Sequence, residues 1–294
     1  ISVSVGIAKT KTLTKVANEI AKKHPQYGGV VDLSKSPERE LDVYLGQLGV
    51  ADVWGVGHQY AKLLRAQGIK TARDLKYADM KWIRKRMTVM GERCVLELRG
   101  VLCFGLDRYP MPKKGIRSSR SFGKSVTKRE ELEEAVASYV SRAAEKLRSQ
   151  NSCANILIVY IKTNKFKRDE PQYANSLHIK LKEPTANTID LTRHALYGLG
   201  KIYKSGYRYK KAGVLLEGIQ PDSPIQLHLF SSLDYAGRER EETLMKTMDK
   251  INKKWGRGSL RLAAEGIRQR WKMRRSMLSP AYTSSWEDLL IISV

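Results

Sequence analysis

The apolar positions of the first hundred residues predict one strand followed by helices. The chain opens on an apolar run that we expect to break at Gly6 and to lead straight into an amphipathic helix ending near Lys23. The buried stripe of this helix is predicted to contain Leu13, Val16, Ala17 and Ile20. A short apolar run at 29–33 follows, helical spacing resumes over 38–48, and helical patterning continues to about Leu102.

Beyond residue 115 the pattern alternates between strand and helix. Strands are predicted over 117–126, 154–163, 174–181 and 209–218, and helices over 128–148, 188–203 and 238–254. The order βαββαβ is typical of a split βαβ sandwich that leaves one face of its sheet exposed. Proline and glycine in the segment 109–115 indicate a linker, so we expect a domain boundary there.

Composition adds a partner class to this picture. A length of 294 residues predicts two or three domains, and no apolar run is long enough to span a bilayer. The formal net charge of +24 is spread along the whole chain. This distribution favours a surface that follows a phosphate backbone, so nucleic acid is the leading candidate partner. The alternative is a merely soluble basic protein.

Cysteine usage excludes two kinds of site. Cys94, Cys103 and Cys153 show no Cys-x-x-Cys spacing near a His, so neither a disulfide framework nor a zinc site is predicted. A reducing cytoplasm fits this usage. The chain begins with Ile rather than Met and carries no secretory signal, which we interpret as a start inside a longer chain.

Two features of the first hundred residues are candidates for phosphate contact. Three lysines share one side of the first predicted helix: Lys11, Lys15 and Lys22. They either clamp a phosphate or form a solvated face. Gly55, Val56 and Gly57 precede an Ala-x-x-Leu spacing and are typical of a helix-hairpin-helix unit, whose glycines and helix amides approach a phosphate. The alternative is an ordinary helical turn.

Basic residues also recur on the predicted strands. The candidates for DNA contact there are Arg117, Arg120, Lys124, Arg208, Lys210 and Lys211. A further basic group follows the second strand: Lys162, Lys165, Lys167 and Arg168. These residues can converge on one face, and such a sheet can lie along a duplex backbone. We interpret the interleaved tyrosines as cross-strand packing partners rather than base-stacking platforms: Tyr160, Tyr173, Tyr207 and Tyr209.

A short peptide near residue 228 has its own candidate role. Gln226-Leu227-His228-Leu229-Phe230 follows a Pro-Asp-Ser-Pro loop. It resembles the motif by which bacterial polymerases and repair proteins dock into the sliding clamp, with Leu and Phe in an apolar pocket and Gln at its rim. The alternative is a short edge strand. The Met- and Trp-bearing end, 271–286, offers a surface either for a partner or for local packing.

With these motifs in view, the whole chain resembles the later two-thirds of a Y-family (translesion) DNA polymerase of the bacterial SOS type. The resemblance is carried by several stretches, among them Ser-Val-Gly-Ile-Ala-x-Thr-Lys-Thr-Leu-x-Lys at 4–15, Gly-Gly-Val-Val-Asp-Leu-Ser at 28–34, Val-Trp-Gly-Val-Gly at 53–57, Ser-Arg-Ser-Phe-Gly at 119–123, Gln-Leu-x-Leu-Phe at 226–230 and Met-Leu-Ser-Pro-x-Tyr-Thr at 277–283.

The resemblance implies a multidomain α+β fold. Its parts are the end of the palm (1–35), a helical thumb with the helix-hairpin-helix (36–112), a βαββαβ little finger (113–225), and a clamp-binding peptide with a C-terminal region (226–294). It also implies that Lys22, and secondly Lys15, contact the triphosphate of the incoming nucleotide. A cation there neutralises the charge that develops as pyrophosphate leaves.

The same family holds two Mg²⁺ through an Asp and a later Asp-Glu pair. No residue here matches either motif, and nothing matches the fingers, so we expect no metal ligand in this chain and no catalysis by it alone. Mg²⁺ is then expected only in a full-length family member.

The function implied is that of the DNA-binding portion of an error-prone SOS polymerase, acting at damaged primer-template in the bacterial cytoplasm and nucleoid. The implied partners are DNA, the sliding clamp, a UmuD-like dimer and a RecA filament. Two alternatives stay open at this point. One is a non-catalytic, clamp-tethered DNA-binding module, and the other is a helix-hairpin-helix nuclease or structural DNA protein.

Overall fold

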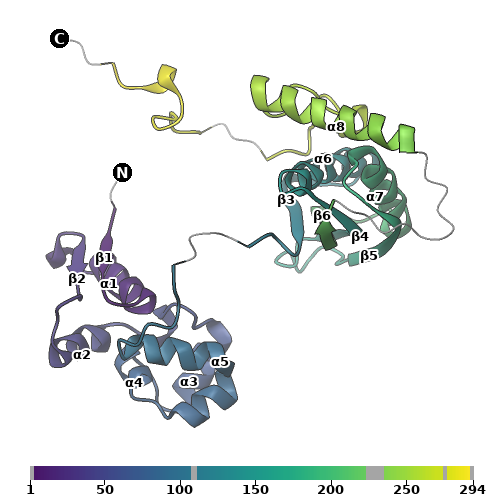
Figure 1. Cartoon of the computed structure of the whole chain (residues 1–294). Coiled ribbons are helices and arrows are strands. Elements are labelled where there is room, and N and C mark those ends of the chain that lie inside the picture. Colours follow the sequence, from purple (N-terminus) through teal and green to yellow (C-terminus); the bar gives the residue numbers. More distant parts are fainter. Residues whose placement is uncertain (1–2, 107–110, 223–234, 274–276, 292–294) are drawn as a thin grey trace. The chain divides into compact units, whose positions relative to one another are not determined.

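The structure, a computed structural model, describes residues 3–106, 111–222, 235–273 and 277–291. The chain divides into two units, residues 1–110 and 111–294, and each has its own hydrophobic core (Figure 1). Both units contain helices and strands. The predicted α+β class is therefore confirmed.

The first unit begins with a helix packed on two parallel strands. β1 (Val5–Ile7) pairs with β2 (Val30–Asp32), and α1 (Lys11–Lys23) buries the predicted apolar stripe. The prediction that the strand breaks at Gly6 is wrong, because Gly6 lies inside β1 opposite Val31. A side chain at Gly6 would collide with the backbone of Asn18 and Thr14 in α1. The glycine therefore permits close packing of strand on helix rather than ending the strand.

Four more helices complete this unit: α2 (Glu38–Gln47), α3 (His58–Ala66), α4 (Ala72–Lys76) and α5 (Met80–Leu98), with the short 3₁₀ turns η1 (Pro25–Tyr27) and η2 (Val50–Asp52). Their apolar faces join α1 in one core. The helical patterning expected to about Leu102 ends at Leu98, and α5 is interrupted at Thr88, whose φ is 64°.

The buried carboxylate of Glu97 joins the start of α1 to the end of α5. Its Oε2 accepts hydrogen bonds from the backbone N and the Oγ1 of Thr12 at 2.8 and 2.9 Å, and its Oε1 accepts from the backbone N of Cys103 and Phe104 at 3.1 and 2.9 Å. Burial raises the pKa of Glu97, but these hydrogen bonds to the charged form outweigh it and hold the pKa below the ordinary value. The negative charge also faces the positive end of the helix dipole.

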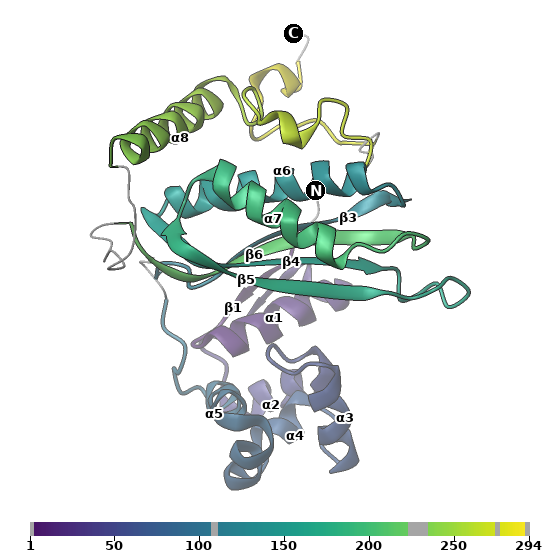
Figure 2. The same ribbon diagram turned by 90° about the vertical axis from the view of Figure 1, so that its right-hand side faces the viewer.

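The second unit contains the order β3 (Ile116–Val126), α6 (Arg129–Arg148), β4 (Ser152–Thr163), β5 (Ala174–Thr185), α7 (Thr188–Ile202) and β6 (Tyr209–Pro221). The predicted βαββαβ order is present, with each element within a few residues of its expected bounds. The strands form one antiparallel sheet in the order β3-β6-β4-β5. α6 and α7 both lie on one face of this sheet, where the core forms (Figure 2).

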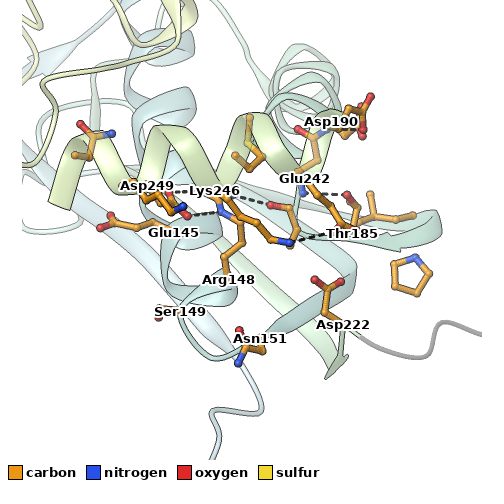
Figure 3. A pocket seen from close by; sticks show the side chains of 18 of the residues that line it. Glu145, Arg148, Ser149, Asn151, Thr185, Asp190, Asp222, Glu242, Lys246 and Asp249 are labelled. Carbon is orange, nitrogen blue, oxygen red and sulfur yellow. Dashed lines mark hydrogen bonds and ion pairs between the residues drawn. The ribbon is translucent and has the colours of Figure 1, made fainter. Parts of the chain in front are cut away.

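The last helix, α8 (Tyr235–Trp255), packs over α6 and α7 on their side away from the sheet (Figure 2). Arg148, at the end of α6, holds it in place. The guanidinium donates to both oxygens of Asp249 at 2.7 Å (Figure 3). It also donates to the carbonyl of Ala186 and the hydroxyl of Thr188. The 3₁₀ turns η3 (Ala263–Glu265) and η4 (Trp286–Asp288) follow.

Replacing Glu97 by Gln tests the role of this carboxylate. The NH₂ group of the amide cannot accept a hydrogen bond, so it would face buried N–H donors that the carboxylate now satisfies. We therefore expect the free energy of unfolding of the first unit to fall by about 2–4 kcal/mol at neutral pH. Because the folded pKa is lowered, this difference should be complete above the unfolded pKa of about 4.3 and should vanish as the pH falls through the folded pKa. Amide hydrogen exchange of α1 peptides across a urea series measures it.

The matched control is Glu92→Gln on the same helix, which removes only an ion pair to the exposed Arg84. We expect it to change stability by less than about 1 kcal/mol. Equal effects of the two substitutions, or no weakening of the Glu97→Gln effect in acid, would contradict the assigned role.

Candidate nucleic-acid interface

One face of the four-stranded sheet is turned away from α6 and α7, and we call it the open face. Leu157, Val159 and Ile161 of β4 point into the core, so the residues between them point to the open face. Registers across the strands assemble three rows there: Ser121, Lys211, Lys162 and Ala174; Ser119, Gly213, Tyr160 and Ser176; Arg117, Leu215, Ile158 and His178. Residues that are far apart in sequence thus form one surface.

At the centre of the open face an arginine side chain lies against a tyrosine ring. Arg117 donates from Nε to the hydroxyl of Tyr160 at 3.0 Å, and its guanidinium carbon lies 4.7 Å from the ring centroid. The ring passes over Gly213, where an added Cβ would meet the hydroxyl oxygen at 2.6 Å. Arg117 keeps further donors for an anion, since a guanidinium has five N–H groups. Lys162 and Lys211 lie together in the neighbouring row.

A second basic group surrounds a cavity of about 380 Å³ at the end of the sheet, which we call the basic cleft. It is lined by Gly123, Lys124, Ser125, Asn164, Lys167, Arg208 and Lys210. Lys210 donates from Nζ to the carbonyl of Phe122 at 2.6 Å. Glu170 receives ion pairs from Lys167 at 2.8 Å and Arg208 at 3.7 Å. Four cations against one adjacent carboxylate favour an anion such as a phosphate.

The six basic residues predicted on the strands do not share one face. Arg117 and Lys211 lie in the rows of the open face, whereas Lys124, Arg208 and Lys210 line the basic cleft. Arg120 pairs with Ala212, a core residue, and so belongs to the side that carries α6 and α7. The physical reason is the period of two along a strand, which places residues 117 and 120 on opposite faces. The expectation of a single face was wrong for Arg120.

Most of the interleaved tyrosines are packing partners, as predicted. The ring of Tyr173 lies 4.9 Å from that of Tyr207 and 6.2 Å from that of Tyr209, and all three contact the core. Burial raises the pKa of Tyr209. Tyr160 differs, because it lies on the open face against Arg117.

The predicted glycine turn of the first unit leads into α3. Gly55 has φ 94°, a conformation that favours glycine, and Val56 between the glycines is buried. Gly57 caps α3 with an ordinary φ of −78° and offers no side-chain hydrogen bond to the helix amides. A Cβ at Gly57 would meet nothing within 4 Å. Neither a positive φ nor packing requires glycine at position 57. Glycine is preferred over alanine at a helix N-cap, and it also lets a ligand approach the helix amides closely.

The lysines of α1 separate into two groups. Lys15 and Lys22 are exposed and lie two helical turns apart on one side. None of the described acidic groups forms an ion pair with either of them. The neighbouring Lys23 forms ion pairs with Asp52 and Glu19. Lys11 is engaged elsewhere, since its Nζ donates to the carbonyl of Gly105 at 2.6 Å. Lys15 and Lys22 are thus available to an anion, while Lys11 is held by the chain itself.

Other sites in the described ranges are less suited to a polyanion. A cavity of about 1030 Å³ beside α8 is lined by acids and bases in similar number, and Arg148 within it is already bonded to Asp249 (Figure 3). Within those same ranges, no three His, Cys, Asp or Glu side chains are placed to hold a metal ion. The clamp-like peptide Gln226, Leu227, Leu229 and Phe230 lies outside the described residues.

None of the helices in the described part of the chain has both the length and the apolar character needed to cross a membrane.

The chain is similar to several known proteins over most of its length. Residues 113–229 match the impB/mucB/samB family C-terminal domain, and residues 242–292 match a domain of unknown function, DUF4113. The chain is 45% identical to Protein UmuC of Salmonella typhimurium over 99% of this chain and 68% of that protein. It is 40% identical to Protein MucB of Escherichia coli, over 99% and 67%. It is 24% identical to DNA polymerase IV of Clostridium acetobutylicum, over 87% and 60%.

A pair of glycine substitutions separates ligand approach from folding at the turn before α3. Gly57→Ala should lower the free energy of unfolding by no more than about 1 kcal/mol, because the added methyl group meets open space and only the N-cap preference for glycine is lost, but it should weaken binding of a DNA duplex at least severalfold. Gly55→Ala should lower the free energy of unfolding by about 1–2 kcal/mol, because its φ is positive. Fluorescence anisotropy with labelled duplex and thermal melts measure the two effects. Unaltered DNA affinity in Gly57→Ala would contradict phosphate contact at this turn.

Proposed function

This chain belongs to the UmuC-like branch of the Y-family translesion DNA polymerases, and from that membership we propose that it binds primer-template DNA at damaged sites during the SOS response. The observation that carries the proposal is the open face of the sheet, where Arg117, Lys162 and Lys211 come together from three strands. Phosphates of a DNA backbone bind such cations and release counterions.

The two units would divide the work on DNA. Residues 113–225 act as the little finger, which lays its open face and basic cleft along the backbone. Residues 36–112 act as the thumb, whose helix-hairpin-helix turn at Gly55 and Gly57 aims the uncapped amides of α3 at a phosphate. Both contacts read backbone rather than base sequence, which suits a polymerase that must act at lesions of differing structure.

Residues 1–35 would act as the end of the palm, with Lys22 and Lys15 directed at the triphosphate of the incoming nucleotide. The supporting observation is that both ammonium groups are exposed on one side of α1, whose start is held by Glu97. Cations there stabilise the charge that develops on the leaving pyrophosphate. The described residues do not offer a site that fits the family's Mg²⁺.

Further contacts complete the proposal. The peptide 226–230 would dock into the sliding clamp, which keeps the polymerase at the primer end through an effectively intramolecular encounter. A UmuD-like dimer and a RecA filament are partners proposed from family membership alone. With these partners the protein would work in the bacterial cytoplasm, at the nucleoid during repair.

A double substitution on the open face tests DNA binding. Lys162→Met combined with Lys211→Met should reduce the slope of log affinity against log salt by about two, because two phosphate contacts are lost. The matched control is Lys250→Met with Lys253→Met on α8, which removes the same charge on the side of the sheet opposite the open face. Anisotropy titrations from low to moderate salt measure both. Equal losses in the two double variants would show that net charge alone acts, and a wild-type affinity independent of salt would contradict the proposed function.

Leu229→Ala with Phe230→Ala tests the clamp peptide. We expect this change to abolish association with the bacterial sliding clamp, because the two apolar anchors are removed, while affinity for bare DNA stays unchanged. Surface plasmon resonance on immobilised clamp and DNA measures both. Loss of clamp and DNA binding together would indicate a structural role for the peptide.

A further inference from the structure

The segment 259–272, which we call the clasp, lies within the region matched by the domain of unknown function and packs along α6. Glu265 in the turn η3 is buried and accepts a hydrogen bond from Ser141 of α6 at 2.8 Å. Trp271, one residue before the end of the clasp, is only 4% exposed and belongs to the core of the second unit. Residues outside the βαββαβ fold thus complete its core.

Trp271 contacts the strand that borders the basic cleft. Its ring centroid lies 6.4 Å from that of Phe122 in β3 and 5.6 Å from that of Tyr139 in α6, both with the rings edge to face. The next connection is polar, because the carbonyl of Phe122 accepts the Nζ of Lys210 at 2.6 Å. Lys210 lines the basic cleft. A continuous series of contacts therefore runs from the clasp to a cleft cation.

The position of Phe122 depends on its side chain because strand pairing fails there. The register between β3 and β6 shifts between Ser121 and Val126, so the ladder does not fix the backbone over 122–125. The ring of Phe122 is 1% exposed and is anchored in the core, with Trp271 on one side of it. Removing Trp271 would free the segment whose carbonyl holds Lys210.

We propose that the clasp positions the basic cleft: Trp271 fixes Phe122, the carbonyl of Phe122 fixes the ammonium of Lys210, and docking of the clasp and binding of a DNA phosphate in the cleft strengthen one another. Trp271 is on this account a positioning residue that does not touch DNA. The proposal assigns a role to the region matched by the domain of unknown function, and it rests on the proposed function, because the cleft must bind DNA.

Docking of the clasp carries a free-energy cost, because it buries polar atoms without partners. A docked state of only modest stability can be strengthened by DNA binding. Three buried polar atoms at this contact have no hydrogen-bond partner among the described residues: the hydroxyl of Tyr139, Oε1 of Gln269 and Nε1 of Trp271. A small cavity of about 110 Å³ also remains beside the clasp. Unsatisfied polar groups lower the net gain of docking. A ligand that favours the docked state then shifts the equilibrium toward it.

The first experiment compares two tryptophans of the same region in the full chain. Trp271→Leu, which keeps an apolar side chain in the core, should reduce the salt slope of duplex binding by about one and weaken affinity about fivefold to tenfold at 0.1 M salt, the loss expected for one phosphate contact. Trp286→Leu is the matched control, since Trp286 is 89% exposed, and it should bind like the wild type. Trp271→Phe, which retains an aromatic ring beside Phe122, should restore binding.

The second experiment is a double-mutant cycle with Lys210→Met. If Trp271 acts through Lys210, the double variant should bind no more weakly than Lys210→Met alone. The proposal would be overturned if the two substitutions weakened DNA affinity independently, so that their fold-losses multiplied in the double variant. Equal affinities of Trp271→Leu and Trp286→Leu would also overturn it. A wild-type chain that binds DNA without salt dependence would instead overturn the proposed function itself. Because a general loss of structure would also weaken the Lys210→Met background, the cycle keeps the proposal falsifiable.

Discussion

In the described part of the second unit, α6 and α7 cover only one face of the sheet, and the chemistry of the chain depends on that constraint. α6 and α7 both pack on the face that carries Leu157, Val159 and Ile161. Since side chains alternate along a strand, the residues between these must point to the other face. The antiparallel registers then bring Arg117, Lys162 and Lys211 together from three strands. One-sided burial thus converts a dispersed positive charge into a surface.

In the first unit a buried carboxylate fixes the helix that carries the candidate phosphate-binding lysines. Glu97 satisfies the orphan N–H of Thr12 at the start of α1 and two N–H groups after the end of α5. Close packing of β1 at Gly6 against the backbone of Thr14 and Asn18 holds the other side of α1. Lys15 and Lys22 extend from a helix that is therefore fixed by a polar contact at its start and by the core along its length. The position of Lys15 and Lys22 therefore follows from the fixed helix and does not depend on ion pairs of these lysines.

The sequence was enough to predict elements whose periodicity is strong. The stripe of α1, the order βαββαβ and the bounds of α6 follow from regular apolar spacing, which packing reinforces. The local pattern gave a wrong prediction at Gly6. The glycine is needed there because the strand packs closely against a helix eight or more residues away in sequence. The face of Arg120 was predictable from strand alternation, which the grouping by strand alone ignored.

Other features had no local signal. Glu97 binds groups 85 residues away, and its role appears only once α1 and α5 are packed together. The hold of Phe122 on Lys210 depends on a shift of register that no periodicity reveals. The other buried members of the core that contains Trp271 end at Leu216, so the burial of Trp271 could not be predicted from its neighbours in sequence.

The most direct test of the account is lysine reactivity measured with and without bound duplex. Acetylation of each lysine in the full chain, quantified by mass spectrometry, reports which ammonium groups DNA covers. The account predicts that Lys162, Lys211 and Lys210 become protected, while Lys250 and Lys253 on α8 react as before. Protection confined to α8, or equal protection of all lysines, would contradict the open face and the basic cleft as the surface that binds DNA.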